Sequence, residues 1–181
     1  MILSFGASGF NCLRWAGEFY PEDLPAEWCC DYYANEFDSV YLNHEKLDEF
    51  NSAIASLDSN FYLLVEDDQK FHRLFKVLEK KGLPRIGYCT CNNSAPLHVG
   101  QFLLHTGKVS STDGLLDESQ YVLAYHEAAI SDSELKKLVE YLFRQFKTSS
   151  HVFVFFEGDA VSTSQIKRAQ TICDLMDGCT A

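Results

Sequence analysis

Hydrophobic residues along the chain form short continuous runs, and amphipathic segments separate these runs. Each run predicts a strand that is buried on both faces, because such a strand has no side that needs polar residues. The runs lie at 2–5, 40–42, 61–65, 85–89, 101–105, 121–125 and 152–156. The run at 101–105 is the least distinct, since the residues around it, from 92 to 120, have the composition of loops.

Between the runs, apolar residues recur every three or four positions, which predicts helices with one buried face. The predicted helices lie at 24–37, 47–57, 68–81, 131–146 and 163–176. Ser131 and Glu134 have the spacing of a capping box, in which the serine hydroxyl and the glutamate carboxylate each accept a hydrogen bond in the first turn. Strands that alternate with helices over residues 1–181 predict a single α/β domain with a parallel sheet, either open or closed into a barrel.

A glycine-rich turn follows the first run, at Gly6 and Gly9. A dinucleotide-binding fingerprint needs a third glycine at the position of Cys12, and a nucleophile elbow needs one at Phe10. We therefore interpret the two glycines as a tight turn between a strand and the next segment.

The composition narrows the classes of partner. The chain has 181 residues, of which 26 are acidic and 15 basic, so its formal net charge is −11. A surface of this charge repels phosphate groups, and no run of about eighteen apolar residues is present, so we expect no nucleic-acid partner and no membrane partner. The cysteines are odd in number, and the first residues lack the pattern of an export signal. We therefore expect reduced, buried thiols and a cytoplasmic location.

Four motifs near the start of the chain and two near its end have the order and spacing of a known family. They are Gly6–Phe10, Trp15–Pro21, Tyr32–Ala34 and Phe37–Asn43, followed by Tyr121–His126 and Phe155–Asp159. They resemble the motifs G-T-S-G-W, W-x-G-x-F-Y-P, Y-Y-A, F-x-T-V-E-I-N, Y-V-R-L-H-G and F-N-N-D of the YecE-like family, also called domain of unknown function 72. The resemblance implies a TIM-type parallel β/α barrel, and it implies no particular reaction.

The chain is shorter than the family pattern. Family members generally have further strand–helix units in the middle, so the resemblance implies a shortened or incomplete barrel with about six or seven such units. The strand edges next to missing units need a cover, because open edges pair with other chains. We expect either a segment from residues 92–120 or a second copy, in a homodimer, to cover them.

In a barrel of this kind, functional residues lie at the carboxyl ends of the strands, where the following loops meet on one face. This rule selects the candidate site residues Ser8, Asn43, His44, Glu66, Cys91, His126, Glu127, Glu157 and Asp159. The set contains four carboxylates and no certain cation. The family has lysine or arginine where this chain has Asp48, Glu66 and Ala124, so the resemblance implies that an ancestral anion site is lost here.

Two functions fit this acidic face. In the first, it is a non-catalytic scaffold that binds an unidentified small molecule or another protein, and no cofactor is expected. In the second, a divalent metal serves a metal-assisted hydrolase, although no His-Glu-x-x-His motif supports the metal. The candidate metal ligands are His126, Glu66, Glu157 and Asp159. Thiol chemistry at Cys89 or Cys91 is a third alternative, although no basic residue close by in sequence would activate the thiol.

Overall fold

The computed structural model describes residues 1–10, 13–43, 57, 59–67, 85–91, 95–111, 114–116 and 118–177. Its strands are β1 (Ile2–Ser8), β2 (Ser39–Leu42), β3 (Tyr62–Glu66), β4 (Arg85–Cys91), β5 (Leu97–Val99), β6 (Phe102–Ser110), β7 (Gln120–Tyr125) and β8 (His151–Glu157). Its helices are η1 (Ala26–Trp28), α1 (Cys29–Ala34), α3 (Asp132–Gln145) and α4 (Thr163–Asp177). The predicted helix at 68–81 and most of the one at 47–57 lie outside the described residues.

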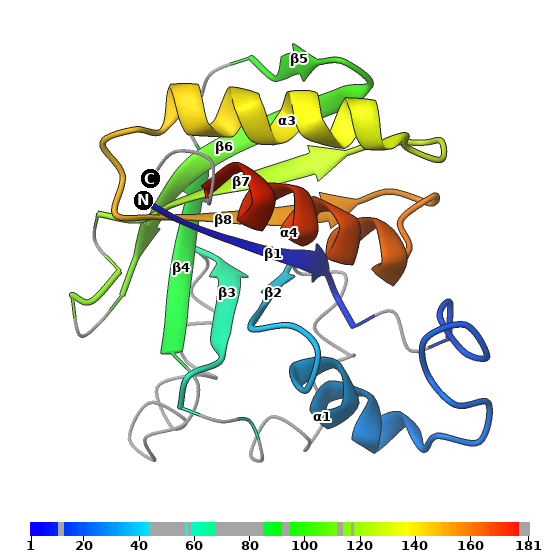
Figure 1. Cartoon of the computed structure of the whole chain (residues 1–181). Helices are drawn as coiled ribbons and strands as arrows, with labels where there is room; N and C mark the ends of the chain where they lie inside the picture. Colours follow the sequence, from blue (N-terminus) through cyan, green and yellow to red (C-terminus); the bar gives the residue numbers. More distant parts are fainter. Residues whose placement is uncertain are drawn as a thin grey trace.

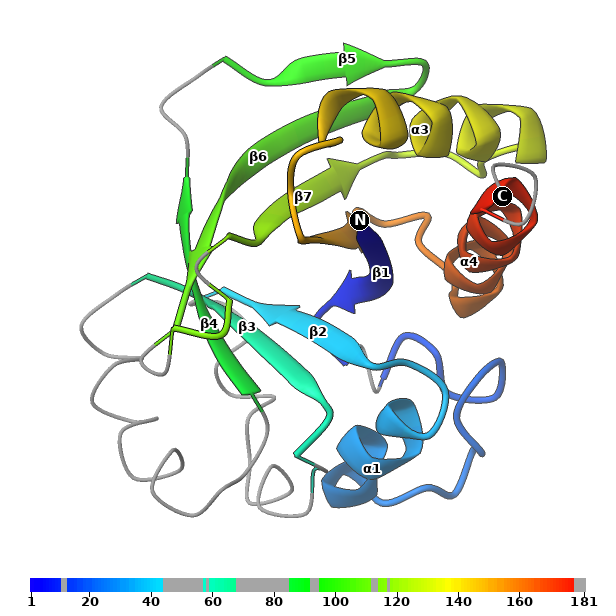
Figure 2. The same ribbon diagram turned by 60° about the vertical axis from the view of Figure 1, so that its left-hand side comes forward.

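The strands form one sheet that closes into a mixed barrel (Figures 1 and 2). Six of its strands are parallel, in the order β4-β3-β2-β1-β8-β7. β6 is antiparallel to both β4 and β7, and these two pairings complete the barrel. β5 pairs with β6 outside the barrel, and the hairpin that they form lies beside α3 (Figure 2).

The expected all-parallel barrel is therefore wrong at one strand, β6. A parallel strand needs a long crossover, usually helical, to return the chain to the same end of the sheet, whereas an antiparallel strand can follow a short connection. β6 continues from 101–105 to Ser110, and nine residues separate its end from the start of β7. The expected edge cover from residues 92–120 is confirmed, since β6 pairs with both edges, so the barrel does not require a second copy to seal it.

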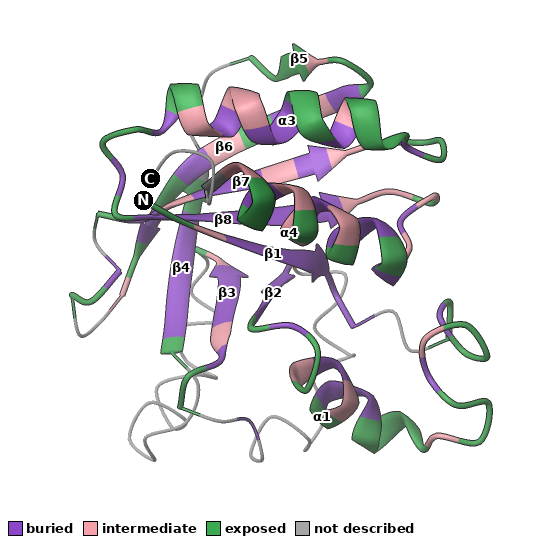
Figure 3. Cartoon of the chain, viewed as in Figure 1, coloured by how far each residue is buried: buried purple, intermediate pink, exposed green. Residues whose placement is uncertain are grey.

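Two apolar clusters hold the fold together. The inner cluster fills the barrel with side chains from six strands and one loop; it consists of Tyr41, Leu64, Cys89, Val109, Leu116, Tyr121, Phe153 and Phe155. The larger outer cluster lies between the strands and the helices, and the strands are accordingly buried along most of their length (Figure 3). β1 and β2 lie close together at Gly6, where a Cβ would overlap the carbonyl oxygen of Ser39 on the neighbouring strand.

Half of the predicted capping box at α3 is confirmed. The Ser131 hydroxyl accepts a hydrogen bond from the Glu134 backbone N–H at 3.3 Å. The Glu134 carboxylate accepts instead from Lys137 Nζ at 2.6 Å and from the Gln101 backbone N–H at 3.3 Å. The hydrogen bond from Lys137 is the main reason that the pKa of Glu134 is lowered. This carboxylate therefore fixes the turn between β5 and β6 to the start of α3.

Candidate functional site

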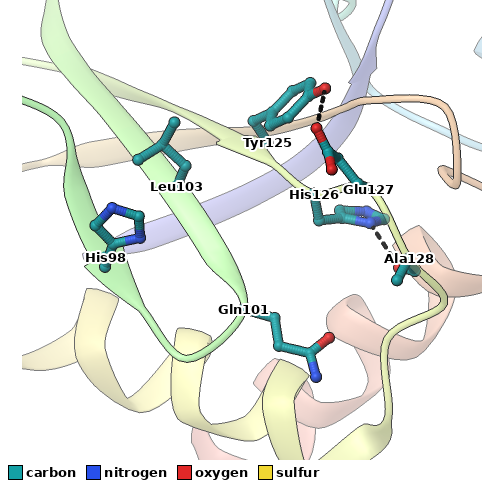
Figure 4. A pocket seen from close by; sticks show the side chains of 7 residues that line it. All are labelled: His98, Gln101, Leu103, Tyr125, His126, Glu127 and Ala128. Atoms are coloured by element: carbon teal, nitrogen blue, oxygen red, sulfur yellow. Dashed lines mark hydrogen bonds between the residues drawn. The ribbon is translucent and has the colours of Figure 1, made fainter.

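The candidate site is a pair of hollows where β1, β7 and β8 end. β8 lies between β1 and β7, so the last residues of all three strands are neighbours. The β8 hollow measures about 310 Å³ and is lined by Ser8, Arg14, Tyr125, Phe156, Glu157, Gly158, Asp159 and Val161. The β7 hollow measures about 290 Å³ and is lined by His98, Gln101, Leu103, Tyr125, His126, Glu127 and Ala128 (Figure 4). Tyr125 lines both hollows.

Ser8 and Glu157 face each other across the β8 hollow because they end adjacent parallel strands. Ser8 is buried and Glu157 half-buried, and the serine Oγ donates to Glu157 Oε1 at 3.5 Å. Asp159 follows in the turn after β8 and is fully exposed. The polar wall of the β8 hollow is thus made largely of carboxylate oxygens.

Arg14 brings a cation to the same hollow. Its Nη1 donates to the Gly158 carbonyl oxygen at 2.8 Å and lies 3.9 Å from Asp159 Oδ1. The loop that carries Arg14 is anchored by the next residue, Trp15, which is buried and whose indole Nε1 donates to the Val161 carbonyl oxygen at 3.1 Å. The predicted absence of a certain cation on this face is therefore corrected.

Tyr125 sits among three carboxylates. Its hydroxyl donates to Glu127 Oε1 at 3.3 Å, a contact drawn in Figure 4. The negative charge of Glu127 is the main reason that the pKa of Tyr125 is raised, and the charges of Asp159 and Glu157 act in the same direction. The two hollows therefore share one aromatic ring and one region of negative potential.

His126 is held as a neutral imidazole in the wall of the β7 hollow. Its Nδ1 lies 3.0 Å from the Ala128 carbonyl oxygen, and because a carbonyl can only accept, Nδ1 carries the proton. Burial lowers the pKa of His126, and the charge of Arg14 lowers it further, while the bond to Ala128 opposes the change. Nε2 is then an acceptor, and it is buried without a hydrogen-bond partner in the described part of the protein.

The turn after β8 requires a glycine at Gly158. Its φ is +125°, a value that other residues rarely adopt, and a Cβ there would overlap the carbonyl oxygen of His126. The same approach lets the His126 N–H donate to the Glu157 carbonyl oxygen at 3.0 Å. Gly158 therefore sets how close the two hollows lie.

Comparison with known proteins now bears on this architecture. No family model matches the chain, and no curated protein does so. A solved structure of a DUF72 family protein from Thermotoga maritima is similar, with a TM-score of 0.59 and 14% sequence identity, and the match covers 98% of this chain and 100% of that one. The chain has a DUF72-like fold. This likeness agrees with the family that the sequence motifs predicted, and the reaction remains a separate question.

The DUF72-like barrel brings five of the predicted site residues to the two hollows. Ser8, Glu157 and Asp159 line the β8 hollow, while His126 and Glu127 line the β7 hollow. The other four do not line these hollows or cannot be placed: Asn43 and Glu66 are half-buried beyond β2 and at the end of β3, Cys91 ends β4, and His44 lies outside the described residues. Within the described ranges, no three His, Cys, Asp or Glu side chains are grouped as metal ligands.

The sequence analysis missed two lining residues, Arg14 and Tyr125. Tyr125 is the last residue of the run at 121–125, directly before His126, so the strand-end rule could have included it. Arg14 lies in the loop that follows the first strand, and such loops belong to the same face. The signal was therefore present for both residues.

The cysteines of the described chain belong to the core. Cys29, Cys30, Cys89 and Cys173 are buried and take part in no disulfide, which confirms the prediction for these four thiols. Burial raises the pKa of Cys30 to about 12, so its thiolate is scarce at neutral pH. None of the described helices has the length and apolar character needed to cross a membrane.

Proposed function

We propose that this DUF72-like barrel is a non-catalytic binding protein for a small polar ligand, which it holds where β1, β7 and β8 end. The supporting observation is that Tyr125 lines two hollows, of about 290 and 310 Å³. Ligand sites commonly occupy about 300–1,000 Å³ and combine apolar walls with a few convergent polar groups. The paired hollows have this size and this mixture of side chains.

The polar groups of the hollows favour binding over catalysis. A nucleophile and its base usually lie about 2.6–3.2 Å apart. The Ser8 hydroxyl is 3.5 Å from Glu157, and no hydroxyl of the described residues donates to His126 Nε2. We assign these groups to ligand recognition.

Thermal unfolding in the presence of small ligands tests this proposal. The panel contains a monosaccharide, phosphate, a dicarboxylate, a diamine, Mn²⁺ and Zn²⁺. A ligand at about one hundred times its Kd stabilises a folded protein by about 2.7 kcal/mol, which raises Tm by about 5–10 °C at this chain length. We expect such a shift for an organic member of the panel, and its loss in Glu157→Gln.

Glu118→Gln is the matched control. Glu118 is exposed, and it precedes β7, so it lies at the opposite end of the barrel from Glu157. Both substitutions remove one negative charge, and only the change at Glu157 alters a hollow. The proposal fails if no member of the panel raises Tm, or if both variants lose the shift equally.

The two metal ions test the alternative of a metal-assisted hydrolase. The feature that supports it is the unpartnered Nε2 of His126, a suitable metal ligand. A rise of Tm with Mn²⁺ or Zn²⁺ that disappears in Glu66→Ala and His126→Ala would favour that alternative.

The proposal extends to the origin and location of the protein. It treats the barrel as a shortened TIM-type barrel in which β6 stands in place of missing units. Its four free, buried thiols suit the cytoplasm, where thiols stay reduced.

A further inference from the structure

We propose that the ligand is a small aliphatic diamine, bound as a dication across the two hollows. This inference rests on the proposed binding function and names the chemistry of its ligand. It follows from the hydrogen-bonding groups, the charges and the unpartnered imidazole of the described residues.

Three side chains that line the hollows already donate hydrogen bonds within the protein. The hydroxyl of Ser8 donates to Glu157, and that of Tyr125 donates to Glu127. Arg14 Nη1 donates to a backbone carbonyl oxygen at 2.8 Å. The carboxylate oxygens that line both hollows can only accept hydrogen bonds, so they favour a ligand with N–H or O–H donors.

The charges select an ammonium compound among such ligands. Glu157 and Asp159 line the β8 hollow and Glu127 lines the β7 hollow, so each hollow offers carboxylate to one positive group. All three carboxylates act on the phenol of Tyr125, which shows that their fields overlap at the ring between the hollows. Arg14 is the only lysine or arginine among the described residues that line either hollow, and the net charge of −11 attracts cations from a distance.

Tyr125 suits the carbon chain of a diamine. It lines both hollows, so a chain that runs from one hollow to the other passes its ring. An aromatic ring contacts methylene groups favourably, and its face attracts an adjacent ammonium group.

His126 supplies independent support for a donor-bearing ligand. Its side chain is in the wall of the β7 hollow, the residue is only 2% exposed, and its Nε2 has no partner among the described residues. Buried polar atoms in native proteins are nearly always hydrogen-bonded. An N–H or O–H donor that reached Nε2 from the β7 hollow would supply the missing hydrogen bond, which a carboxylate ligand could not do.

Calorimetric titration of the full chain with diaminobutane tests the inference. Butanediol has the same chain length without charge, n-butylamine has one ammonium group, and succinate has two negative charges. At equal ionic strength we expect diaminobutane to bind at least about tenfold more tightly than n-butylamine, because one charge-assisted contact is lost. Butanediol and succinate should give no measurable heat of binding.

Three variants locate the site. Glu157→Gln and Glu127→Gln should each weaken diaminobutane binding by about tenfold, since each removes one carboxylate charge that lines a hollow. Glu118→Gln removes the same charge far from the hollows and should leave the Kd within about twofold. Thermal unfolding of each variant establishes that it is folded.

The remaining outcomes separate this inference from the proposed function. Equal binding of butanediol and diaminobutane, or equal weakening by Glu118→Gln and Glu157→Gln, would overturn the diamine site. If diaminobutane does not bind while another organic member of the thermal panel does so through Glu157, the inference is wrong and the binding function stands. If no organic ligand binds, both are wrong.

Discussion

The two ends of the barrel hold the same kinds of side chain in different arrangements. At the amino end, Ser4 Oγ donates to Asp38 Oδ2 at 3.1 Å and lies 2.8 Å from His151 Nε2. Beside them, Arg85 Nη1 donates to the Tyr62 hydroxyl at 2.6 Å. At the carboxyl end, serine, acid, tyrosine and arginine also meet, but their side-chain contacts are 3.3–3.9 Å long and surround two hollows.

The comparison shows why a Ser, His and Asp cluster is not by itself an active site. In a catalytic triad the acid orients the histidine, and the histidine takes the proton of the serine. Here the Ser4 hydroxyl donates to Asp38, so its proton is directed away from His151. The close contacts of the amino end, of which the one between Ser4 and His151 is buried, stabilise the fold, whereas the groups of the carboxyl end are spaced around two hollows.

Gly158→Ala should have the largest effect on the difference between the two ends of the barrel. The φ of +125° is unfavourable for alanine, and the new Cβ would overlap the His126 carbonyl oxygen, so we expect a loss of about 3 kcal/mol in the free energy of unfolding. Urea unfolding measures the loss. Gly17→Ala is the control: its φ is +76°, but a Cβ there would meet only the Glu22 side chain at 3.4 Å, and we expect about 1 kcal/mol. Equal losses in the two variants would show that the close approach of Gly158 to His126 does not determine the structure of the carboxyl end.

The two serines of β1 allow the ends to be compared directly. Ser4→Ala leaves the buried His151 and the exposed Asp38 without their shared partner, and the loss at His151 should lower the free energy of unfolding by about 2 kcal/mol. Ser8→Ala removes one long contact beside a hollow that water can enter, and we expect a loss below about 1 kcal/mol. Chemical denaturation of both variants checks this order. A larger loss for Ser8→Ala would contradict our assignment of the amino end to stability and of the carboxyl end to ligand binding.

The sequence predicted the strands better than their directions. Buried strands produce continuous apolar runs such as 121–125 and 152–156, and both became strands within a residue or two. The run at 101–105 also became a strand, but its direction was unpredictable, because apolar periodicity is the same in parallel and antiparallel pairs.

The candidate site was predictable in part. Ser8 and Glu157 were predicted from their positions at the ends of strands, because the carboxyl ends of parallel strands share one face of a barrel. The amino-end network was not predictable: Ser4 is 34 residues from Asp38 and 147 from His151, and no local pattern connects them. The free Nε2 of His126 also depends on the packing around it, at Phe102 and Phe156.

His151 should make the amino end sensitive to acid. Burial is the main cause that lowers its pKa from 6.5 to about 4, and Arg85 adds to this while Asp38 opposes it. Between these values the unfolded chain binds the proton more tightly, so the stabilising contribution is complete above about pH 6.5 and is lost as the pH falls to about 4. With allowance for solvent screening we expect a loss of about 1.5 kcal/mol.

Denaturant unfolding of the wild type and His151→Gln across this pH range measures that loss. Glutamine keeps a donor for Ser4 and has no titration, so the stability of the variant should fall less steeply with acid. His126, whose pKa is also lowered, is present in both proteins and cancels in the comparison. Parallel profiles for the two proteins would exclude His151 as the cause.

The tyrosine hydroxyls should show the smallest difference in stabilising contribution between the two ends of the barrel. Tyr125→Phe removes the contact with Glu127, a fully exposed partner, and should change Tm by less than about 1 °C. Tyr62→Phe removes a 2.6 Å contact with Arg85 and should lower Tm by about 3 °C. Because Tyr125→Phe keeps the ring, it should also leave the Kd for diaminobutane within about twofold, whereas Tyr125→Ala should weaken binding by about tenfold. Equal weakening by phenylalanine and alanine would assign the contribution of Tyr125 to its hydroxyl, and the ring would then have no part in joining the two hollows.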